Sequence, residues 1–463
     1  MPTKRKRLKN YRIGLVDADL LDNGTRHPNL VLLKIAGYLH DNGVFFELIT
    51  TPDADISQYD LIYMSTVFTY TKKPKFYEMA YDKEKNQKFR CGGTGEYANE
   101  TNVSRFKELR AADMYQLEND SFLRKLRNHR GGVRVHGIDM ARQMPFYDLY
   151  MPFIEERIAN GEKRDKYKDY LKYSIGFLTR GCYRHCPFCV NKLENNILPY
   201  SKLEWFRDEK RPHIYFWDDN FLAAPYEVWH PILQELIDKK ITFQFRQGLD
   251  ERQLAENEHG IEMAEMLSKA HYHGDYIFAF DNWRDRNTIE RALKIWKRCC
   301  PKKGTKFYLF CGFKLTPEDD KRLYKDVWEI FARIHILMQY GCIGYIMRHE
   351  DYRNHELANI YVQIARWCNQ PAFYKKMSFW EFCYRNQTFW EEHTLGRAVT
   401  PLKPYDEFVK DFEAGYYNTT KMCRPLKTFI SFLERFKEHK EELLAMFNYK
   451  LSDLINPSLW ENN

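Results

Sequence analysis

Short apolar runs alternate with amphipathic segments over the first hundred residues. Residues 12–21, 44–50 and 59–69 are rich in aliphatic and aromatic side chains, as buried strands are. Between the first two runs, residues 29–43 carry apolar side chains at helical spacing and end at Gly43, a residue typical of helix ends. Strands that alternate with helices predict a parallel sheet in this part of the chain.

A second series of apolar runs follows at intervals of about thirty residues, with helix-like segments between them. These runs predict six strand–helix units, and the polar residues gather where each run ends. Because the carboxyl ends of parallel strands share one edge, chemistry is expected there. The runs lie at 174–180, 213–221, 241–250, 275–282, 306–313 and 343–350.

Beyond residue 350 the pattern becomes helical. Two stripes of apolar side chains recur at helical spacing and indicate a buried core, with nucleic-acid stacking as the alternative use of their aromatic rings. They comprise Leu357, Ile360, Tyr361, Ile364 and Trp367, and then Phe429, Phe432, Leu433, Phe436, Leu443 and Phe447.

Together these patterns predict an α/β protein with three folded regions in a chain of 463 residues, which exceeds one comfortable core. We expect a Rossmann-like parallel sheet domain at 11–165, a partial (β/α)6 TIM-like barrel at 166–350 and a mainly helical domain at 351–463. Residues 1–10 form a basic tail.

The net charge of +8 is concentrated in that tail, because Lys4, Arg5, Lys6, Arg7 and Lys9 supply five of the charges. Such a tail either binds nucleic acid through phosphates or is a solvated end. No signal peptide and no run of 18 apolar residues is present, so we expect a cytoplasmic protein without membrane insertion. In a reducing cytosol, clustered cysteines indicate metal binding or catalysis and not disulfides.

One such cluster exists, in the segment GCYRHCPFC at 181–189. Cys182, Cys186 and Cys189 follow the first strand of the predicted barrel. A structural zinc site normally takes four protein ligands, and His185 is the nearby residue that could supply the fourth. A 4Fe-4S cluster held by three thiolates keeps one iron open for an exchangeable ligand, so that three cysteines are then sufficient.

The spacing Cys-x3-Cys-x2-Cys, with Phe188 before the last cysteine, resembles the signature of the radical S-adenosylmethionine (radical SAM) superfamily. The resemblance implies that Cys182, Cys186 and Cys189 bind a 4Fe-4S cluster. It also implies that the cluster binds S-adenosylmethionine and cleaves it reductively to methionine and a 5'-deoxyadenosyl radical. A flavodoxin or ferredoxin would supply the electron.

The same resemblance implies cofactor contacts at the ends of the later strands. Asp218, Asp219 and Asn220 stand where family members hold the methionine amino group, although the usual Gly-Gly-Glu is absent, and a solvated strand end is the alternative. Arg246, accompanied by Gln247 and Asp250, would bind the carboxylate of S-adenosylmethionine, or it would pair with Asp218 or Asp219. The fourth strand ends at Asp281 and Asn282, candidates for the ribose hydroxyls, and Gly312 for the adenine. Cys311 is expected to be a core thiol.

The N-terminal sheet followed by a barrel resembles the radical SAM proteins that carry a cobalamin-binding-like domain. The residues 26–43 and the segment CGGTGEY at 91–97 carry this resemblance, although a tight turn explains these glycines equally well. In the usual cobalamin motif Asp-x-His-x-x-Gly, Leu21 occupies the histidine position. We therefore favour a domain that has lost cobalamin and serves as scaffold or substrate platform over one that binds it without a histidine.

Three functions follow from these features. The first is a radical enzyme that functionalises an unreactive C–H position of an unidentified substrate, with a nucleic acid or nucleotide among the candidates. The second is a cobalamin-dependent methyltransferase, and the third a non-catalytic, metal-stabilised nucleic-acid-binding protein. A second cluster is not expected, because only Cys91 precedes the motif and the cysteines beyond the predicted barrel are widely spaced.

Overall fold

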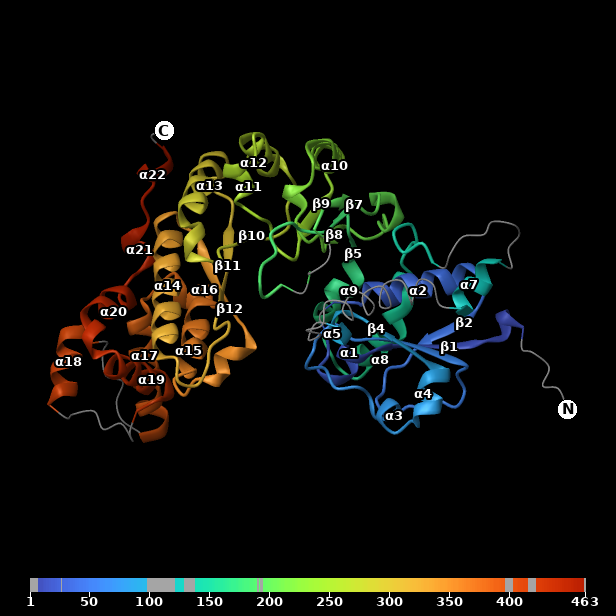
Figure 1. Ribbon diagram of the computed structural model, residues 1–463, viewed down its shortest axis with the longest axis horizontal. Coiled ribbons are helices and arrows are strands. Elements are labelled where there is room, and N and C mark those ends of the chain that lie inside the picture. Colours follow the sequence, from blue (N-terminus) through green and yellow to red (C-terminus); the bar gives the residue numbers. More distant parts are fainter. Residues whose placement is uncertain are drawn as a thin grey trace. The chain divides into compact units, whose positions relative to one another are not determined.

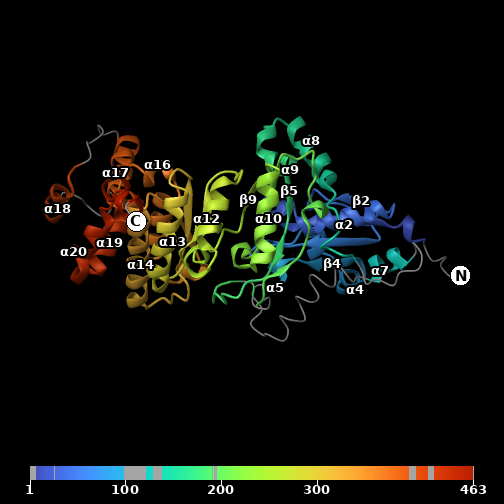
Figure 2. The same ribbon diagram turned by 90° about the horizontal axis from the view of Figure 1, so that it is seen from above.

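The computed structural model describes residues 7–25, 27–97, 121–128, 138–189, 191, 195–395, 403–414 and 422–461. Lys4, Arg5 and Lys6 of the predicted tail lie outside these ranges. The chain divides into two compact units (Figures 1 and 2). Unit 1 comprises Met1–Phe221 and Ile241–Arg246, and unit 2 comprises Leu222–Lys240 and Gln247–Asn463. The boundary between the two units therefore falls within residues 166–350, which the sequence patterns predict as one barrel domain.

Unit 1 begins with a four-stranded parallel sheet in the order β2-β1-β3-β4 (Figure 1). The first three strands coincide with the predicted apolar runs, whereas β4 was not predicted; the predicted Rossmann-like parallel sheet is confirmed. They are β1 (Arg12–Asp17), β2 (Phe45–Leu48), β3 (Leu61–Ser65) and β4 (Phe89–Gly92).

Both faces of this sheet are buried, which explains why β1 and β3 read as continuous apolar runs. Ile13 and Leu15 pack on the side of helix α2 (Leu30–Asp41), whereas Val16 packs with Ile62 and Phe76 on the other side. Helix α2 begins after Asn29, whose side chain accepts a hydrogen bond from the Leu32 amide. The further helices of unit 1 are α1 (Ala18–Asp22), α3 (Lys75–Glu78), α4 (Asp82–Lys88), α5 (Thr94–Tyr97), α7 (Ser121–Asn128), α8 (Met151–Ala159) and α9 (Lys168–Lys172).

A second parallel sheet in unit 1 has the order β5-β8-β9, and a third in unit 2 has the order β10-β11-β12. All six predicted strands are therefore strands of parallel sheets. The first three pair with one another in unit 1, and the last three pair with one another in unit 2. The strands are β5 (Tyr173–Gly176), β8 (His213–Phe216), β9 (Thr242–Phe245), β10 (Tyr276–Ala279), β11 (Thr305–Cys311) and β12 (Ile343–Arg348). Two short strands, β6 (Thr179–Arg180) and β7 (Leu198–Pro199), pair antiparallel.

The two faces of the β5-β8-β9 sheet differ in chemistry. Strand register places Ile175, Tyr215 and Gln244 side by side on one face. Because side chains alternate along a strand, Phe216 and Phe245 lie on the opposite face, where their rings contact each other and Phe216 also contacts the ring of Phe206. One face is thus aromatic and polar, whereas the other is apolar except for Ser174.

Helices make up most of unit 2, and Figure 2 shows α12 and α13 lying alongside each other. The predicted core stripes are confirmed: Ile360, Tyr361, Ile364, Trp367 and the stripe from Phe429 to Phe447 are buried, although Leu357 is only half-buried. In the described ranges, no helix combines the length and apolar character needed to span a membrane. The helices are α10 (Tyr226–Asp238), α11 (Gln253–Glu256), α12 (Gly260–Lys269), α13 (Arg286–Cys299), α14 (Asp320–Gln339), α15 (Asn359–Cys368), α16 (Pro371–Tyr374), α17 (Phe379–Leu395), α18 (Tyr405–Glu413), α19 (Arg424–Arg435), α20 (Lys440–Phe447), α21 (Leu451–Leu454) and α22 (Ser458–Glu461).

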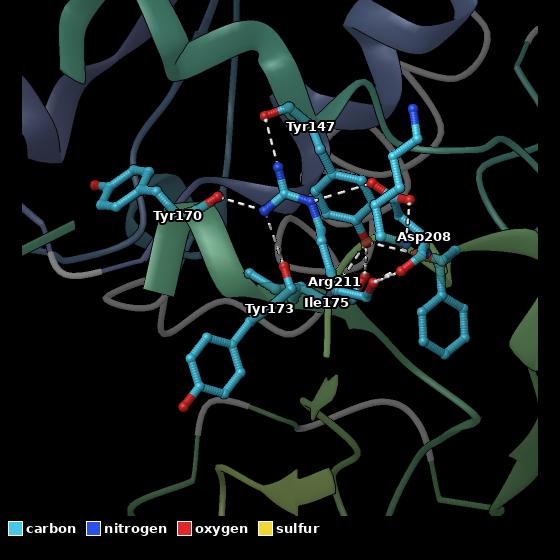
Figure 3. Close-up of polar contacts among 9 residues, drawn as sticks. Tyr147, Tyr170, Tyr173, Ile175, Asp208 and Arg211 are labelled. Atoms are coloured by element: carbon cyan, nitrogen blue, oxygen red, sulfur yellow. Dashed lines mark hydrogen bonds and ion pairs between the residues drawn. The ribbon is translucent and has the colours of Figure 1, made fainter. Parts of the chain in front are cut away.

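A buried arginine ties together the segments of unit 1 that precede the cysteine loop (Figure 3). The Arg211 guanidinium donates to the main-chain oxygens of Tyr147, Tyr170 and Tyr173 and lies 3.4 Å from an Asp208 carboxylate oxygen. It also stacks on the Tyr147 ring. Because a guanidinium has five donors in a rigid fork, one side chain holds α9 and the start of β5 in place.

Candidate functional site

The cysteine loop begins directly after the short strand β6, which itself follows β5, and is anchored at its first turn. Gly181 has a φ of 104°, a conformation that L-residues rarely adopt, and its amide donates to Asp219 Oδ2 at 2.9 Å. Cys182, Cys186 and Cys189 follow, all three partly exposed and without disulfides. Phe188 is likewise half-buried. The backbone thus presents three thiols on one short loop at the carboxyl end of a parallel strand.

Asp218 and Asp219 hold the segment that leads into this loop. Asp218 is 1% exposed and accepts hydrogen bonds from the amides of Leu178 and Thr179 and from the Thr179 hydroxyl. Burial raises the pKa of Asp218 to about 7, against the lowering effect of these hydrogen bonds. Asp219 lies 3.4 Å from the guanidinium of Arg180. Both carboxylates therefore accept from the backbone at 178–181, and Asp219 also contacts Arg180.

Among the described residues, nitrogen donors reach the sulfurs of Cys182 and Cys189. The Asn220 side-chain amide donates to Cys182 Sγ, and the Asn191 backbone amide donates to Cys189 Sγ, each at 3.4 Å. Metal-bound thiolates accept such N–H contacts, so the donor set fits a thiolate-bound cluster. Within the described residues, however, no group of three His, Cys, Asp or Glu side chains is already gathered as a metal site. Cluster binding would have to draw the three thiolates together.

Arg246 follows β9 and lies over the Tyr215 ring, with its guanidinium carbon 4.6 Å from the ring centroid. It donates to Gln244 Oε1 and to His27 Nε2, each at 3.0 Å. His27 Nδ1 lies 3.2 Å from Asp169 Oδ2, and the Tyr215 hydroxyl donates to the other oxygen of Asp169. The expected pairing of Arg246 with Asp218 or Asp219 is therefore wrong, because its polar partners come from β9 and from the loop before α2.

The remaining predicted residues belong to unit 2. Gln247 is exposed. Asp250 is buried and lies 2.7 Å from Arg252 Nε. The Asp281 carboxylate accepts a hydrogen bond from the Phe310 amide, and desolvation raises its pKa to about 6. Gly312 has a φ of 74° and donates its amide to Asp326. A side chain at position 312 would collide with Tyr352, so close packing already requires this glycine.

Cys311 and the glycine segment at 91–97 have structural roles. The Cys311 thiol is buried, as predicted, and burial raises its pKa well above the usual range. Gly93 has a φ of 113°, and an added Cβ would lie 2.2 Å from the Thr66 oxygen. The Gly95 amide donates to the same oxygen. These glycines allow β4 to approach the loop after β3, which supports the tight-turn interpretation.

Three residues near the predicted site were not predicted: Arg180, His27 and Asp169. Arg180 directly precedes the motif, so the charge beside Gly181 was the only available signal. His27 and Asp169 meet Arg246 from positions far away in sequence, which leaves no local pattern. A cavity of about 550 Å³ lies elsewhere in unit 1, near the amino ends of β3 and β4, and contains none of the predicted residues. It is lined by Tyr59, Asp60, Tyr81, Lys83, Glu84, Gln87 and Lys88.

No protein-family model matches the chain, and no curated protein matches it.

Proposed function

We propose that this protein is a cytoplasmic radical SAM enzyme that functionalises an unreactive C–H position of a second substrate. The observation that carries the proposal is the loop with Cys182, Cys186 and Cys189 at the carboxyl end of β5, with N–H donors on two of its sulfurs. The six strands occur in the expected order, and an α-helix follows each of the last five, which supports a partial (β/α)6 barrel as the frame of the site.

When bound, a 4Fe-4S cluster would supply the electron that cleaves S-adenosylmethionine to methionine and a 5'-deoxyadenosyl radical. The chain's own residues hold the cluster and position the loop. Cys182, Cys186 and Cys189 supply the three thiolates. Asn220 orients the first sulfur, while Asp218 and Asp219 fix the backbone at 178–181.

A 4Fe-4S cluster held by three thiolates would leave one iron open to bind S-adenosylmethionine. The contacts that would hold S-adenosylmethionine, with Phe188, Asp250, Asp281 and Gly312 among the candidates, stay predictions, as does a reducing flavodoxin or ferredoxin partner. Cobalamin is not favoured, because α1 places Leu21 where a histidine ligand would stand and the glycines at 93 and 95 are used in packing.

The test is made on protein purified and reconstituted without oxygen, then incubated with dithionite and S-adenosylmethionine. We expect about four irons per chain and release of 5'-deoxyadenosine. Cys182→Ala should lose both cluster and cleavage, because two thiolates hold the cube poorly. Cys299→Ala, which changes a half-exposed thiol outside the motif, serves as the matched control.

Different products would support the other functions. S-adenosylhomocysteine together with bound cobalamin would indicate the methyltransferase. One zinc per chain and no cleavage would indicate a structural metal, and full cleavage by Cys182→Ala would contradict the ligand assignment.

A further inference from the structure

Arg246 belongs to a polar group on the aromatic face of the β5-β8-β9 sheet. Strand register places Tyr215 beside Gln244, and Arg246 continues the Gln244 side of β9. His27, from the loop before α2, packs edge-on against the rings of Tyr215 and Trp217, with centroid separations of 5.6 and 5.5 Å. Four separate segments of unit 1 thus build this group: the loop before α2, α9, β8 and the end of β9.

Among the described residues, the Arg246 guanidinium has no carboxylate as an ion-pair partner. Within the described residues, no Asp or Glu oxygen lies within 4 Å of the Arg246 guanidinium, whose recorded hydrogen-bond acceptors are Gln244 and His27. The nearby carboxylate, Asp169, lies on the far side of the imidazole, beside His27 Nδ1. A half-buried guanidinium that is held against an aromatic ring without a counterion attracts an anion.

The contact with Arg246 also determines the protonation of His27. An arginine can only donate, so His27 Nε2 must accept, and the imidazole is neutral with its proton on Nδ1. Protonation of Nε2 would place two donors against each other and break the contact. An anion that accepts from both Arg246 and His27 removes this conflict, and Asp169 then stabilises the imidazolium.

We propose that Arg246 and His27 form an anion-binding site that takes up one proton when it binds a carboxylate or phosphate group. A neutral His27, one anion and one proton from solution give an imidazolium and a bound anion, so that charge balances. The anionic group belongs either to S-adenosylmethionine or to the second substrate. The inference deepens the proposed function, but binding at this site does not require the cluster.

Among the residues that the structure describes, titratable or charged groups face His27 from three surrounding elements. They are Asp169 from α9, the Tyr215 hydroxyl from β8, and Arg246 after β9. The Tyr215 hydroxyl donates to Asp169, and burial raises the tyrosine's pKa far above neutrality, so this hydroxyl stays protonated. His27 is therefore the group of this set that can take up a proton when an anion binds.

The experiment is calorimetric titration of the full chain with sulfate, an anion that does not itself titrate near neutrality, and separately with S-adenosylmethionine. Each titration is repeated in two buffers with different heats of ionisation, which reports the protons taken up. We expect uptake of up to about one proton per anion, and an affinity that rises up to about tenfold per pH unit as the pH falls toward the pKa of His27.

Substitutions test which residues bind the anion and which residue takes up the proton. Arg246→Gln should weaken binding by about tenfold or more, because a charge-assisted hydrogen-bonded contact is lost. His27→Gln should abolish proton uptake. His40→Gln is the matched control, because His40 also lies beside an aspartate in unit 1 but is exposed. Melting curves check that each variant is folded.

The two probes separate the sources of the anion. Proton-linked binding of S-adenosylmethionine that depends on His27 assigns the site to its carboxylate. Dependence seen with sulfate alone assigns the site to the second substrate. Binding of both probes without proton uptake would overturn the proposal, and so would proton uptake that persists in His27→Gln. Failure of both probes to bind, or an affinity that does not depend on pH in the unmodified chain, would overturn it as well. Cluster content and 5'-deoxyadenosine release, measured in parallel, test the proposed function separately.

Discussion

At the residue scale, three side chains directly after β8 contact the start of the cysteine loop. Asp218 and Asp219 were predicted as ligands of an ammonium group, which stays a prediction, and each has partners in the segment that begins the cysteine loop. Asn220 was predicted with them, and its amide contacts Cys182 Sγ. These three residues thus connect the end of one strand to the loop after its neighbour.

Replacing Asn220 by Ala tests the contact with sulfur. An N–H donor stabilises the more negative, reduced form of a thiolate-bound cluster, so its removal should shift the reduction potential to more negative values while iron content is kept. A redox titration followed by electron paramagnetic resonance measures the change. An unchanged potential would mean that the amide does not contact sulfur in the loaded protein.

A second residue, Asp17, links the stability of unit 1 to pH. Its carboxylate accepts from the Tyr150 hydroxyl and the Leu20 amide, but burial raises its pKa from 3.8 to about 7. The folded chain therefore binds this proton more tightly than the unfolded chain. Its stabilising contribution is complete below pH 3.8 and is lost as the pH rises through about 7.

Asp17→Asn removes this titration. Relative to the unmodified protein, the variant should gain about 2–3 kcal/mol in unfolding free energy between pH 5 and pH 8. Urea unfolding at both pH values measures the gain. Asp41→Asn, at a half-exposed position in the same unit, is the control and should show no comparable change.

At the scale of elements, local sequence predicted strands and helices well, while side chains from distant segments hold them together. Arg211 joins main-chain oxygens on three segments, and Tyr147 from the turn before α8 contacts the main chain of both Ile175 and Phe206. On the opposite face of the sheet, Gly176 leaves room for the Phe206 ring, since an added Cβ would lie 2.3 Å from it. The position of β5, and with it the start of the cysteine loop, depends on these contacts.

Arg211→Leu should destabilise unit 1 by about 3 kcal/mol or more, because buried carbonyl groups and Asp208 lose their partner. The half-exposed Arg157→Leu is the matched control and should cost less than about 1 kcal/mol. Hydrogen exchange should show faster opening of β5 in the first variant alone. Equal protection of β5 in both variants would contradict the role assigned to Arg211.

At the scale of the whole molecule, the two units are interleaved along the chain. Residues 241–246, which include β9, belong to unit 1, although the residues on both sides of them belong to unit 2. Strand β9 completes the sheet that carries the cysteine loop on β5 and Asp218 after β8. The site-bearing sheet thus requires a strand that follows α10 in sequence.

Fragments of the chain test this arrangement. A fragment of residues 1–221 lacks β9, so the edge of β8 is open and Phe216 and Phe221 lose their contacts with Phe245. We expect it to aggregate, whereas a fragment of residues 1–246 should stay in solution with protected β8 amides. Solubility and hydrogen exchange of the two fragments measure the difference. A soluble 1–221 fragment with protected β8 amides would show that β9 is dispensable.

The sequence by itself determined the strands, the helices and the cysteine motif, because each depends on residues close together in the chain. Apolar periodicity located β1, α2 and the six later strands, and the spacing of Cys182, Cys186 and Cys189 is a property of one loop. Tertiary structure alone decided that Arg246 meets His27, that Asp219 holds Gly181, and that β9 belongs with β5 and β8. These contacts join residues 38 to 219 positions apart. Their formation depends on how whole elements pack, which no local pattern records.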